Sequence, residues 1–156
     1  MHITIVAVGQ KLPAWAQTAV DDYLARFPRD FTVTVKEVKA EARTGGKPVA
    51  QVMVAEAERI ERAVPAGDIL VAMDEHGRDM TTVDFSKKIS GWKNEGCGVT
   101  FIIGGADGLD PALKAKSRMM LRLSSMTLPH AFARVLLTEQ IYRAWSILAN
   151  HPYHRV

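Results

Sequence analysis

Cysteine is nearly absent from this sequence, which holds one, Cys97, in 156 residues. A single cysteine excludes an intrachain disulfide and suits a reducing compartment, so we expect a cytoplasmic protein. No apolar run approaches the roughly 20 residues that a membrane-spanning helix needs, so we expect no membrane partner. The first nine residues lack a basic leader and are too short for a signal peptide, and they predict a strand instead.

Several catalytic signatures are also missing. The pattern Gly104-Gly105-x-x-Gly108 is not the dinucleotide fingerprint G-x-G-x-x-G, and the phosphate-binding G-x-x-x-x-G-K-[ST] does not occur. No G-x-S-x-G elbow frames a serine nucleophile. The tail pair His151-x-x-His154 has no cysteine cluster or carboxylate pair beside it, so we expect no metal. These absences count against a dinucleotide-dependent oxidoreductase, a phosphate-loop enzyme and a metalloenzyme.

Charge and length set broad limits. The formal net charge is +3, and 47% of the residues are hydrophobic. A basic balance is compatible with a nucleic-acid partner, but a solvated surface is the commoner cause of such an excess. A chain of this length buries about two-thirds of its unfolded surface and fits one domain, residues 1–156.

Apolar patterning predicts strands that alternate with helices. We expect strands at 2–8, 31–38, 68–73, 99–103 and 119–123, and helices at 13–27, 48–64, 82–94, from 111 and at 130–149. Trp15, Ala19, Tyr23 and Phe27 recur at a spacing of four, which predicts a core stripe on the first helix. The alternation predicts an α/β fold, a mostly parallel sheet with helices on both faces.

Ligands of such sheets bind outside the carboxyl ends of the strands. Three predicted loops lie there, after Met73, Ile103 and Leu123. Glycines at a strand end let a ligand approach the backbone, although a tight turn explains Gly104 and Gly105 equally well. Residues 124–130 offer backbone groups to a ligand, or they form a helix start capped by Thr127 with Pro129 in the first turn.

Three ordered motifs match a known family. They are FIIGGADGL at 101–109, LSSMTLPH at 123–130, and a C-terminal set of Arg134-Val135, Glu139-Gln140, Tyr142-Arg143-Ala144-Trp145 and His151-Pro152-Tyr153-His154-Arg155. VAVG at 6–9 and YLARFP at 23–28 also match. The chain closely resembles, over essentially its whole length, the bacterial ribosomal large-subunit methyltransferase H family. Residues 41–47 differ most from the family's pattern, and we place no function there.

The resemblance implies a single SPOUT-class methyltransferase domain with a C-terminal trefoil knot, acting as a homodimer. It implies S-adenosylmethionine as the cofactor and, as the reaction, methylation of N3 of a pseudouridine in 23S ribosomal RNA, on the assembled ribosome. By motif, the cofactor pocket comprises Met73, Gly104, Gly105, Leu123, Ser124, Ser125, Met126, Thr127 and Leu128. The runner-up is a ribosome- or RNA-binding factor that keeps the fold without the cofactor.

The proton on N3 must leave, and four residues are candidates for the catalytic site. His130, Tyr153 and His154 are candidate proton acceptors, and Arg143 is a candidate cation near developing negative charge. The alternatives are a helix-start hydrogen bond for His130 and a surface salt bridge from Arg143 to Glu139.

Two further hypotheses concern the C-terminal helix. Its apolar residues exceed what one buried stripe needs, which predicts a dimer interface; they are Phe132, Val135, Leu136, Ile141, Tyr142, Trp145 and Leu148. The helix carries the chain roughly 30 Å from His130. The tail is too short to return over that length, so a catalytic tail would have to serve the partner's site.

Overall fold

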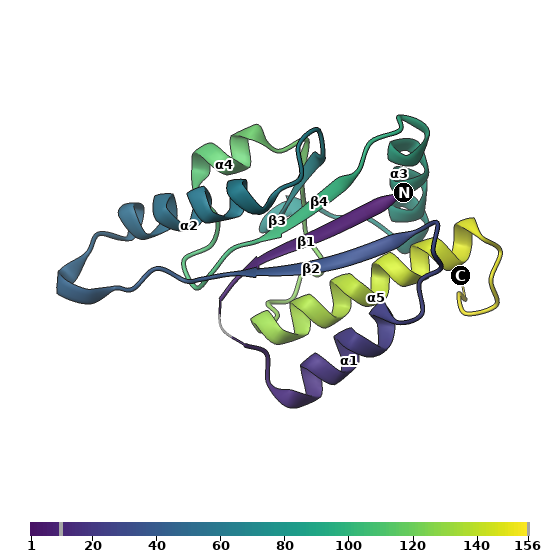
Figure 1. Ribbon diagram of the computed structural model, residues 1–156, viewed down its shortest axis with the longest axis horizontal. Coiled ribbons are helices and arrows are strands. Elements are labelled where there is room, and N and C mark those ends of the chain that lie inside the picture. The colour runs from purple at the N-terminus through teal and green to yellow at the C-terminus, as the bar shows by residue number, and fades with distance from the viewer. Residues whose placement is uncertain (10, 156) are drawn as a thin grey trace.

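The fold is built on one five-stranded sheet (Figure 1). The computed structural model describes residues 1–9 and 11–155. The strands are β1 (His2–Val8), β2 (Thr32–Val38), β3 (Ile69–Arg78), β4 (Val99–Ile103) and β5 (Met119–Leu121), in the order β2-β1-β4-β3-β5. All four pairs of neighbouring strands are parallel, which confirms the predicted sheet.

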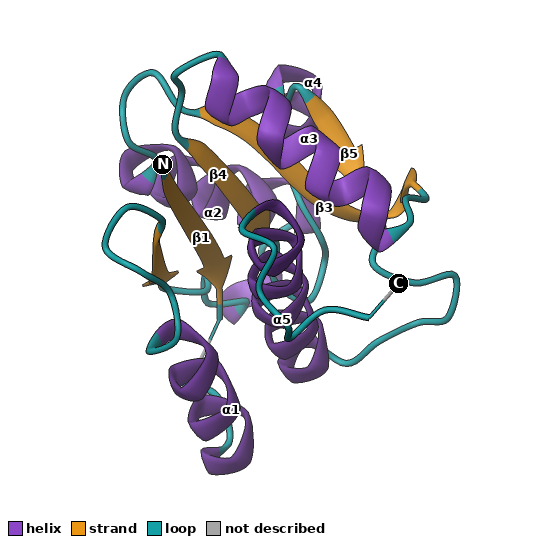
Figure 2. Cartoon of the chain, turned by 90° about the vertical axis from the view of Figure 1, so that its right-hand side faces the viewer, coloured by secondary structure: helices purple, strands orange, loops and turns teal. Residues whose placement is uncertain are grey.

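Helices cover both faces of the sheet, as predicted (Figures 1 and 2). They are α1 (Ala14–Leu24), α2 (Val49–Ala63), α3 (Thr82–Asn94), α4 (Pro111–Lys116) and α5 (His130–Leu148), with a short 3₁₀ turn, η1 (Thr44–Gly46). The helices α2 and α4 pack on one face, and α3 and α5 pack on the other. The helix α1 lies beside α5, where Leu12, Ala16 and Val20 form a small core of their own.

The central strand β4 is buried on both faces because the two helical layers meet its alternate side chains. Phe101 contacts Phe85 and Trp92 of α3 edge-on, with ring centroids 5.9 and 6.4 Å apart. Ile102 belongs to the opposite core with Ile60 of α2 and Leu113 of α4. The predicted doubly buried strand at 99–103 is confirmed, since all five residues are buried.

The N-cap residues of three helices can be compared with the predicted ones. Thr81 accepts a hydrogen bond from the Asp84 amide and caps α3, and Asp110 caps α4 with Pro111 in its first turn. The predicted cap at Thr127 is wrong. The helix α5 begins only at His130, so Pro129 occupies the N-cap position.

Two strand boundaries differ from prediction. The strand β3 continues to Arg78 through the residues expected to form a polar loop, because the chain pairs again with β5 after an irregularity between Met73 and Arg78. At this crossing, a Cβ on Gly77 would lie 2.7 Å from the backbone carbon of Leu121. The strand β5 ends at Leu121 rather than at residue 123, and Met120 on this edge strand is 37% exposed.

The predicted core stripe of α1 is correct only in part, because Phe27 and Tyr23 pack against buried Tyr142 but Trp15 does not. The row that is buried runs through Leu12, Ala16 and Val20, whereas Trp15 is 51% exposed and Tyr23 is half-buried. Both rows have helical spacing, so periodicity alone does not distinguish them. The exposed row reaches Phe132 of α5, whose ring centroid lies 4.8 Å from that of Trp15.

Candidate active site

A cavity of about 610 Å³ opens at the carboxyl ends of the strands, where three loops meet. Met73 ends the regular pairing of β3, Ile103 ends β4, and Leu128 precedes α5. A smaller lobe of about 180 Å³ continues the cavity toward the loop after β5. The two lobes share six lining residues: Met73, Asp74, Glu75, Ile103, Leu128 and Ala133.

Most of the sequence-predicted cofactor residues line this cavity. Gly104 and Gly105 line the larger lobe, and Met73 and Leu128 line both. The smaller lobe is also lined by Leu123, Ser124, Met126 and Thr127. Ser125 is exposed and is not part of the lining. The three strand-end loops therefore do converge, as the parallel topology requires.

The glycine loop after β4 is closed by its own backbone. The Gly108 amide donates to the Gly105 carbonyl at 3.0 Å. A Cβ on Gly104 would lie 2.5 Å from the backbone carbon of Gly108, so the turn needs glycine at 104. A Cβ on Gly105 would meet Val8 and Glu56 at 3.1 Å. A larger residue at 105 would thus disturb the packing behind the loop first.

The loop between β5 and α5 is held at its start. The Arg122 amide donates to the Arg78 carbonyl at 3.1 Å, and its guanidinium forms two hydrogen bonds to Asp79 at 2.6 and 2.8 Å. These hydrogen bonds hold the pKa of the Asp79 carboxyl below its usual value. Ser124 accepts a hydrogen bond from the Met126 amide at 2.9 Å, which makes the loop compact and leaves Met126 76% exposed.

Asp74 and Lys114 form an ion pair on the cavity wall. Their oxygen and nitrogen lie 2.9 Å apart, and the other Asp74 oxygen accepts the His76 amide at 2.8 Å. Burial alone would raise the pKa of Asp74, but these two hydrogen bonds outweigh it and the pKa is lowered. Asp74 therefore stays ionised at neutral pH and keeps Lys114 at the cavity.

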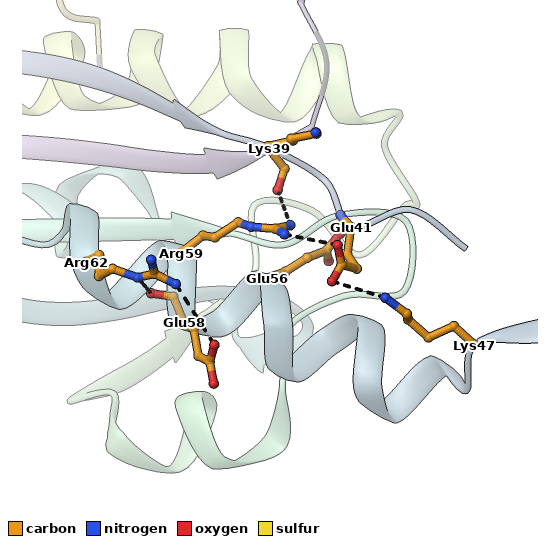
Figure 3. A network of polar contacts seen from close by, with 7 residues as sticks. All are labelled: Lys39, Glu41, Lys47, Glu56, Glu58, Arg59 and Arg62. Atoms are coloured by element: carbon orange, nitrogen blue, oxygen red, sulfur yellow. Dashed lines mark hydrogen bonds and ion pairs between the residues drawn. The ribbon is translucent and has the colours of Figure 1, made fainter. Parts of the chain in front are cut away.

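A polar network fixes the β2–α2 connection behind the glycine loop (Figure 3). Arg59 donates to the Lys39 carbonyl and to Glu41, both at 3.0 Å, and the Glu41 amide donates to buried Glu56 at 3.0 Å. The hydrogen bond from Arg59 holds the pKa of Glu41 below its usual value. Beyond the network, Arg43 forms an ion pair with Asp107 of the cavity lining. Residues 41–47, where we expected no function, therefore contact the cavity wall.

His130 lies at the start of α5 and lines the larger lobe. Its Nε2 accepts a hydrogen bond from Arg134 Nε at 3.0 Å, and Arg134 Nη2 donates to Glu37 of β2 at 2.9 Å. Burial lowers the pKa of His130, the Arg134 charge lowers it further, and Glu37 opposes them. The ring is therefore neutral at physiological pH.

The other three predicted catalytic residues lie in the second half of α5 and in the tail that follows it. The Tyr153 hydroxyl donates to Glu139 at 3.0 Å and lies 3.0 Å from the Tyr23 hydroxyl. Burial and these two hydrogen bonds raise the pKa of Tyr153, so the phenol stays protonated. Arg143 pairs with Glu139 at 2.6 Å and lies 4.9 Å from the centre of the Tyr153 ring. The alternative we named for Arg143, a pair with Glu139, is present.

Within one chain these residues do not join His130. The helix α5 starts beside the carboxyl ends of the strands, and the C-terminus lies toward its other end (Figure 1). Tyr153 folds back only as far as Glu139, which is about 13 Å along the helix from His130. His154 is half-buried, and its Nδ1 has no hydrogen-bond partner within residues 1–9 and 11–155.

Sequence reasoning missed several lining residues. Asp74 and Glu75 directly follow the apolar run of β3, and the strand-end rule points to them. Lys114 and Ala133 come from α4 and α5 and carry no local signal, since only the packing of those helices brings them to the cavity.

In residues 1–9 and 11–155, no helix is long and apolar enough to cross a membrane. Among the same residues, no group of three or more His, Cys, Asp or Glu side chains is placed to hold a metal ion.

A parallel sheet with a ligand-sized cavity at its carboxyl edge defines an α/β protein that binds a small molecule between strand-end loops. Solved structures share this fold. A probable methylase family protein from Haemophilus influenzae superimposes with a TM-score of 0.59 at 12% identity, covering 99% of this chain and 70% of that chain. The SpoU methyltransferase AviRb from Streptomyces viridochromogenes gives a TM-score of 0.50 at 15% identity, covering 96% and 61%.

Sequence comparison identifies the family. The protein-family model described as "Predicted SPOUT methyltransferase" matches residues 1–154. The ribosomal RNA large subunit methyltransferase H of Ralstonia pickettii is 53% identical over 156 residues and covers all of both chains. The protein of that name from Bordetella avium is 54% identical over 155 residues, 99% of each chain. This chain belongs to the SPOUT methyltransferase family, which confirms the resemblance seen in the sequence.

Proposed function

We propose that this protein transfers the methyl group of S-adenosylmethionine to ribosomal RNA of the large subunit. The observation that carries the proposal is identity of more than half over the full length with proteins named for that activity. The cavity at the strand ends supports it, because the glycine loop of the larger lobe and the mainly apolar lining of the smaller lobe suit a nucleoside cofactor.

The finer proposal is that the acceptor atom is N3 of a pseudouridine in 23S ribosomal RNA on the assembled ribosome. The sulfonium of the cofactor is already activated toward displacement. The protein therefore has to align donor and acceptor and stabilise the base as its N3 proton leaves. We further propose that residues 1–156 act as one domain in the cytoplasm, where ribosomes are found.

The predicted trefoil knot remains part of this proposal. The close approach of Gly77 to the Leu121 backbone shows two strands crossing tightly just before the chain turns into α5. A knot would pass α5 through the loop that this crossing closes, and it would be an exception to the rule that chains avoid knots.

Filling the cavity is expected to block both cofactor binding and methylation. Ala133 lines both lobes, so the Leu side chain of Ala133→Leu would enter the shared space. We expect affinity for S-adenosylmethionine to fall about 10-fold or more, which corresponds to at least about 1.4 kcal/mol. Calorimetry measures the affinity. Mass mapping of 23S ribosomal RNA from cells that lack the gene and express either form measures the methyl group.

The matched control is Ala115→Leu on α4, which adds the same atoms at an exposed position outside the cavity lining. It should bind the cofactor as the wild type does. If deleting the gene leaves every methyl group of the large-subunit RNA in place, the proposed function is wrong. If Ala133→Leu binds as tightly as Ala115→Leu, the cofactor binds elsewhere.

We also propose that the protein is a homodimer through α5 and the adjoining row of α1. Of the apolar residues predicted for this interface, Ile141 and Tyr142 are buried in the chain's own core, whereas Phe132, Leu136 and Leu148 remain 37–48% exposed. Trp15 of α1 extends the surface. The contact of Trp15 with Phe132 continues the exposed apolar surface across two helices, and a surface of this kind marks an interaction site.

Charge placed on this surface is expected to separate the dimer. The double variant Trp15→Glu, Phe132→Glu would bury two carboxylates in the interface, at a cost of several kcal/mol. Light scattering at micromolar concentration should give twice the 17.2 kDa chain mass for the wild type and the chain mass for the variant. Val54→Glu on α2, at a 47% exposed position on the opposite layer, should remain a dimer. A wild-type monomer would refute the proposal.

The C-terminal tail is proposed to complete the partner's site. Arg143, Tyr153 and His154 lie away from the cavity of their own chain, and His154 Nδ1 is enclosed without a partner in the described structure. A dimer in which the two α5 helices run antiparallel would bring one chain's tail toward the other's cavity. There Arg143 would stabilise negative charge on the base, and His154 would be the candidate proton acceptor.

A further inference from the structure

Two charged residues in the described part of the chain are buried, Glu56 and Arg134, and Arg134 contacts His130 of the cavity lining. The Arg134 side chain is 3% exposed. It projects from α5 between His130, one turn earlier on the same helix, and Glu37 on β2. A charge buried to this extent costs several kcal/mol unless it is paired and hydrogen-bonded, so its surroundings define what it does.

The contacts of Arg134 fix the protonation of the His130 ring. A guanidinium has only hydrogen-bond donors, so the 3.0 Å contact requires His130 Nε2 to be the acceptor. A neutral imidazole carries one proton, which must then reside on Nδ1. Glu37 accepts a hydrogen bond from a second nitrogen of the guanidinium, Nη2, at 2.9 Å, and this second bond sets the orientation of the Arg134 side chain. His130, which lines the cavity, therefore carries an N–H donor at Nδ1, and its one lone pair is already used.

The surroundings of His130 support the neutral form. Burial is the largest influence that lowers its pKa, the adjacent Arg134 charge adds to it, and Glu37 acts in the opposite direction. The pair Asp74–Lys114 and the residues Glu75, His76 and Asp107 line the same cavity.

We propose that Arg134 is a positioning residue that holds His130 as an Nδ1–H donor toward an acceptor oxygen of the molecule bound in the cavity. The inference rests on the proposed function for the identity of that molecule. On the target base, N3 lies between two carbonyl groups, and negative charge spreads onto their oxygens as the N3 proton leaves. An N–H donor placed there stabilises that charge. On the cofactor, the acceptor is a carboxylate or ribose oxygen.

The first test needs neither cofactor nor RNA. Nitrogen chemical shifts of ¹⁵N-labelled histidine distinguish the two neutral tautomers, and the His130 signals are assigned by their loss in His130→Asn. We expect the Nδ1–H form in the wild type and a shift toward the Nε2–H form in Arg134→Met. Arg134→Leu, which removes the same donors with a side chain of different shape, covers the case in which the methionine variant does not fold. An Nε2–H ring in the wild type, or a tautomer that Arg134 variants do not change, would overturn the proposal.

The second test uses a matched pair at position 130. The side-chain amide of Asn places an N–H near the Nδ1 position, whereas that of Gln places it near Nε2. His130→Asn should keep methyl transfer within about 10-fold of the wild type, and His130→Gln should lose about 10²-fold or more, the usual effect of removing such a donor.

Binding and transfer are then measured separately for both variants. A weaker S-adenosylmethionine affinity of His130→Gln by calorimetry places the acceptor oxygen on the cofactor. Unchanged affinity with slower transfer to large ribosomal subunits places it on the base. If Asn and Gln are equivalent in both measurements, the donor role is wrong. Because the tautomer is read without substrate, failure of the proposed reaction would not be confused with failure of this inference.

Discussion

Removal of residues 151–156 is expected to abolish methyl transfer to large ribosomal subunits while leaving affinity for S-adenosylmethionine within about twofold of the wild type. The cavity is formed by strand-end loops and the start of α5, and none of the side-chain hydrogen bonds or ring contacts described for residues 151–155 reaches one of its lining residues. Instead Tyr153 packs on Tyr23 and Tyr142 near the far end of α5. We expect transfer to fall by at least about 10³-fold if the tail supplies a proton acceptor and a cation.

A mixture of two inactive variants shows which site the tail serves. One partner lacks residues 151–156, and the other carries Ala133→Leu. If the tail acts across the dimer, the mixed dimer has one site with an open cavity and an intact tail. Random pairing should then restore about a quarter of the wild-type activity per chain. If each tail serves its own cavity, no site in the mixture is complete, and activity stays absent.

The deletion also removes aromatic packing, so it needs a control for stability. Tyr153→Phe keeps the ring against Tyr142, whose centroid is 4.7 Å away, and removes only the hydroxyl bonded to Glu139. This variant should fold like the wild type and show whether the hydroxyl contributes to transfer. Full activity of the deleted protein in isolation would refute the role of the tail.

Gly104→Ala is expected to be among the most damaging small substitutions in the chain. The new Cβ would lie 2.5 Å from the Gly108 carbon and 2.7 Å from its oxygen, and both are backbone atoms that cannot rotate away. The loop would have to open, which breaks the hydrogen bond between Gly108 and Gly105. We expect a loss of about 2–4 kcal/mol in the free energy of unfolding and at least about 10-fold in cofactor affinity.

Gly91→Ala is the matched control for this prediction. Gly91 lies inside α3, and nothing is within 4 Å of the position that its Cβ would take. The substitution should therefore stabilise the protein by about 0.5–1 kcal/mol, the difference in helix propensity. Denaturant unfolding measures both changes. Equal stability of Gly104→Ala and the wild type would mean that the loop is not closed by its backbone.

The parallel architecture was predictable because its signals are local. Apolar runs such as 99–103 alternate with helical patterns, and the rule that ligands bind at strand carboxyl ends needs no coordinates. The motifs around Gly104 and Leu128 lie at two such ends, so most of the predicted cofactor residues line one cavity. Predictions of which face of a helix is buried were less accurate, because that face depends on which other element packs against the helix. Trp15 has the spacing of a core row, but the residues of α1 that are buried are Ala16 and Val20.

Local pattern and residue identity were enough to predict the order of elements, the family and the loops that form the cavity. The extension of β3 to Arg78, the approach of Lys114 and Ala133 to the cavity and the contact of Arg134 with His130 appear only in the folded chain. Each of these depends on contacts between segments far apart in the chain, such as Glu37 with Arg134 across 97 positions. Packing between distant segments sets the tautomer of the His130 ring and the surroundings of the Arg134 charge. The sequence pattern around these two residues does not predict either one.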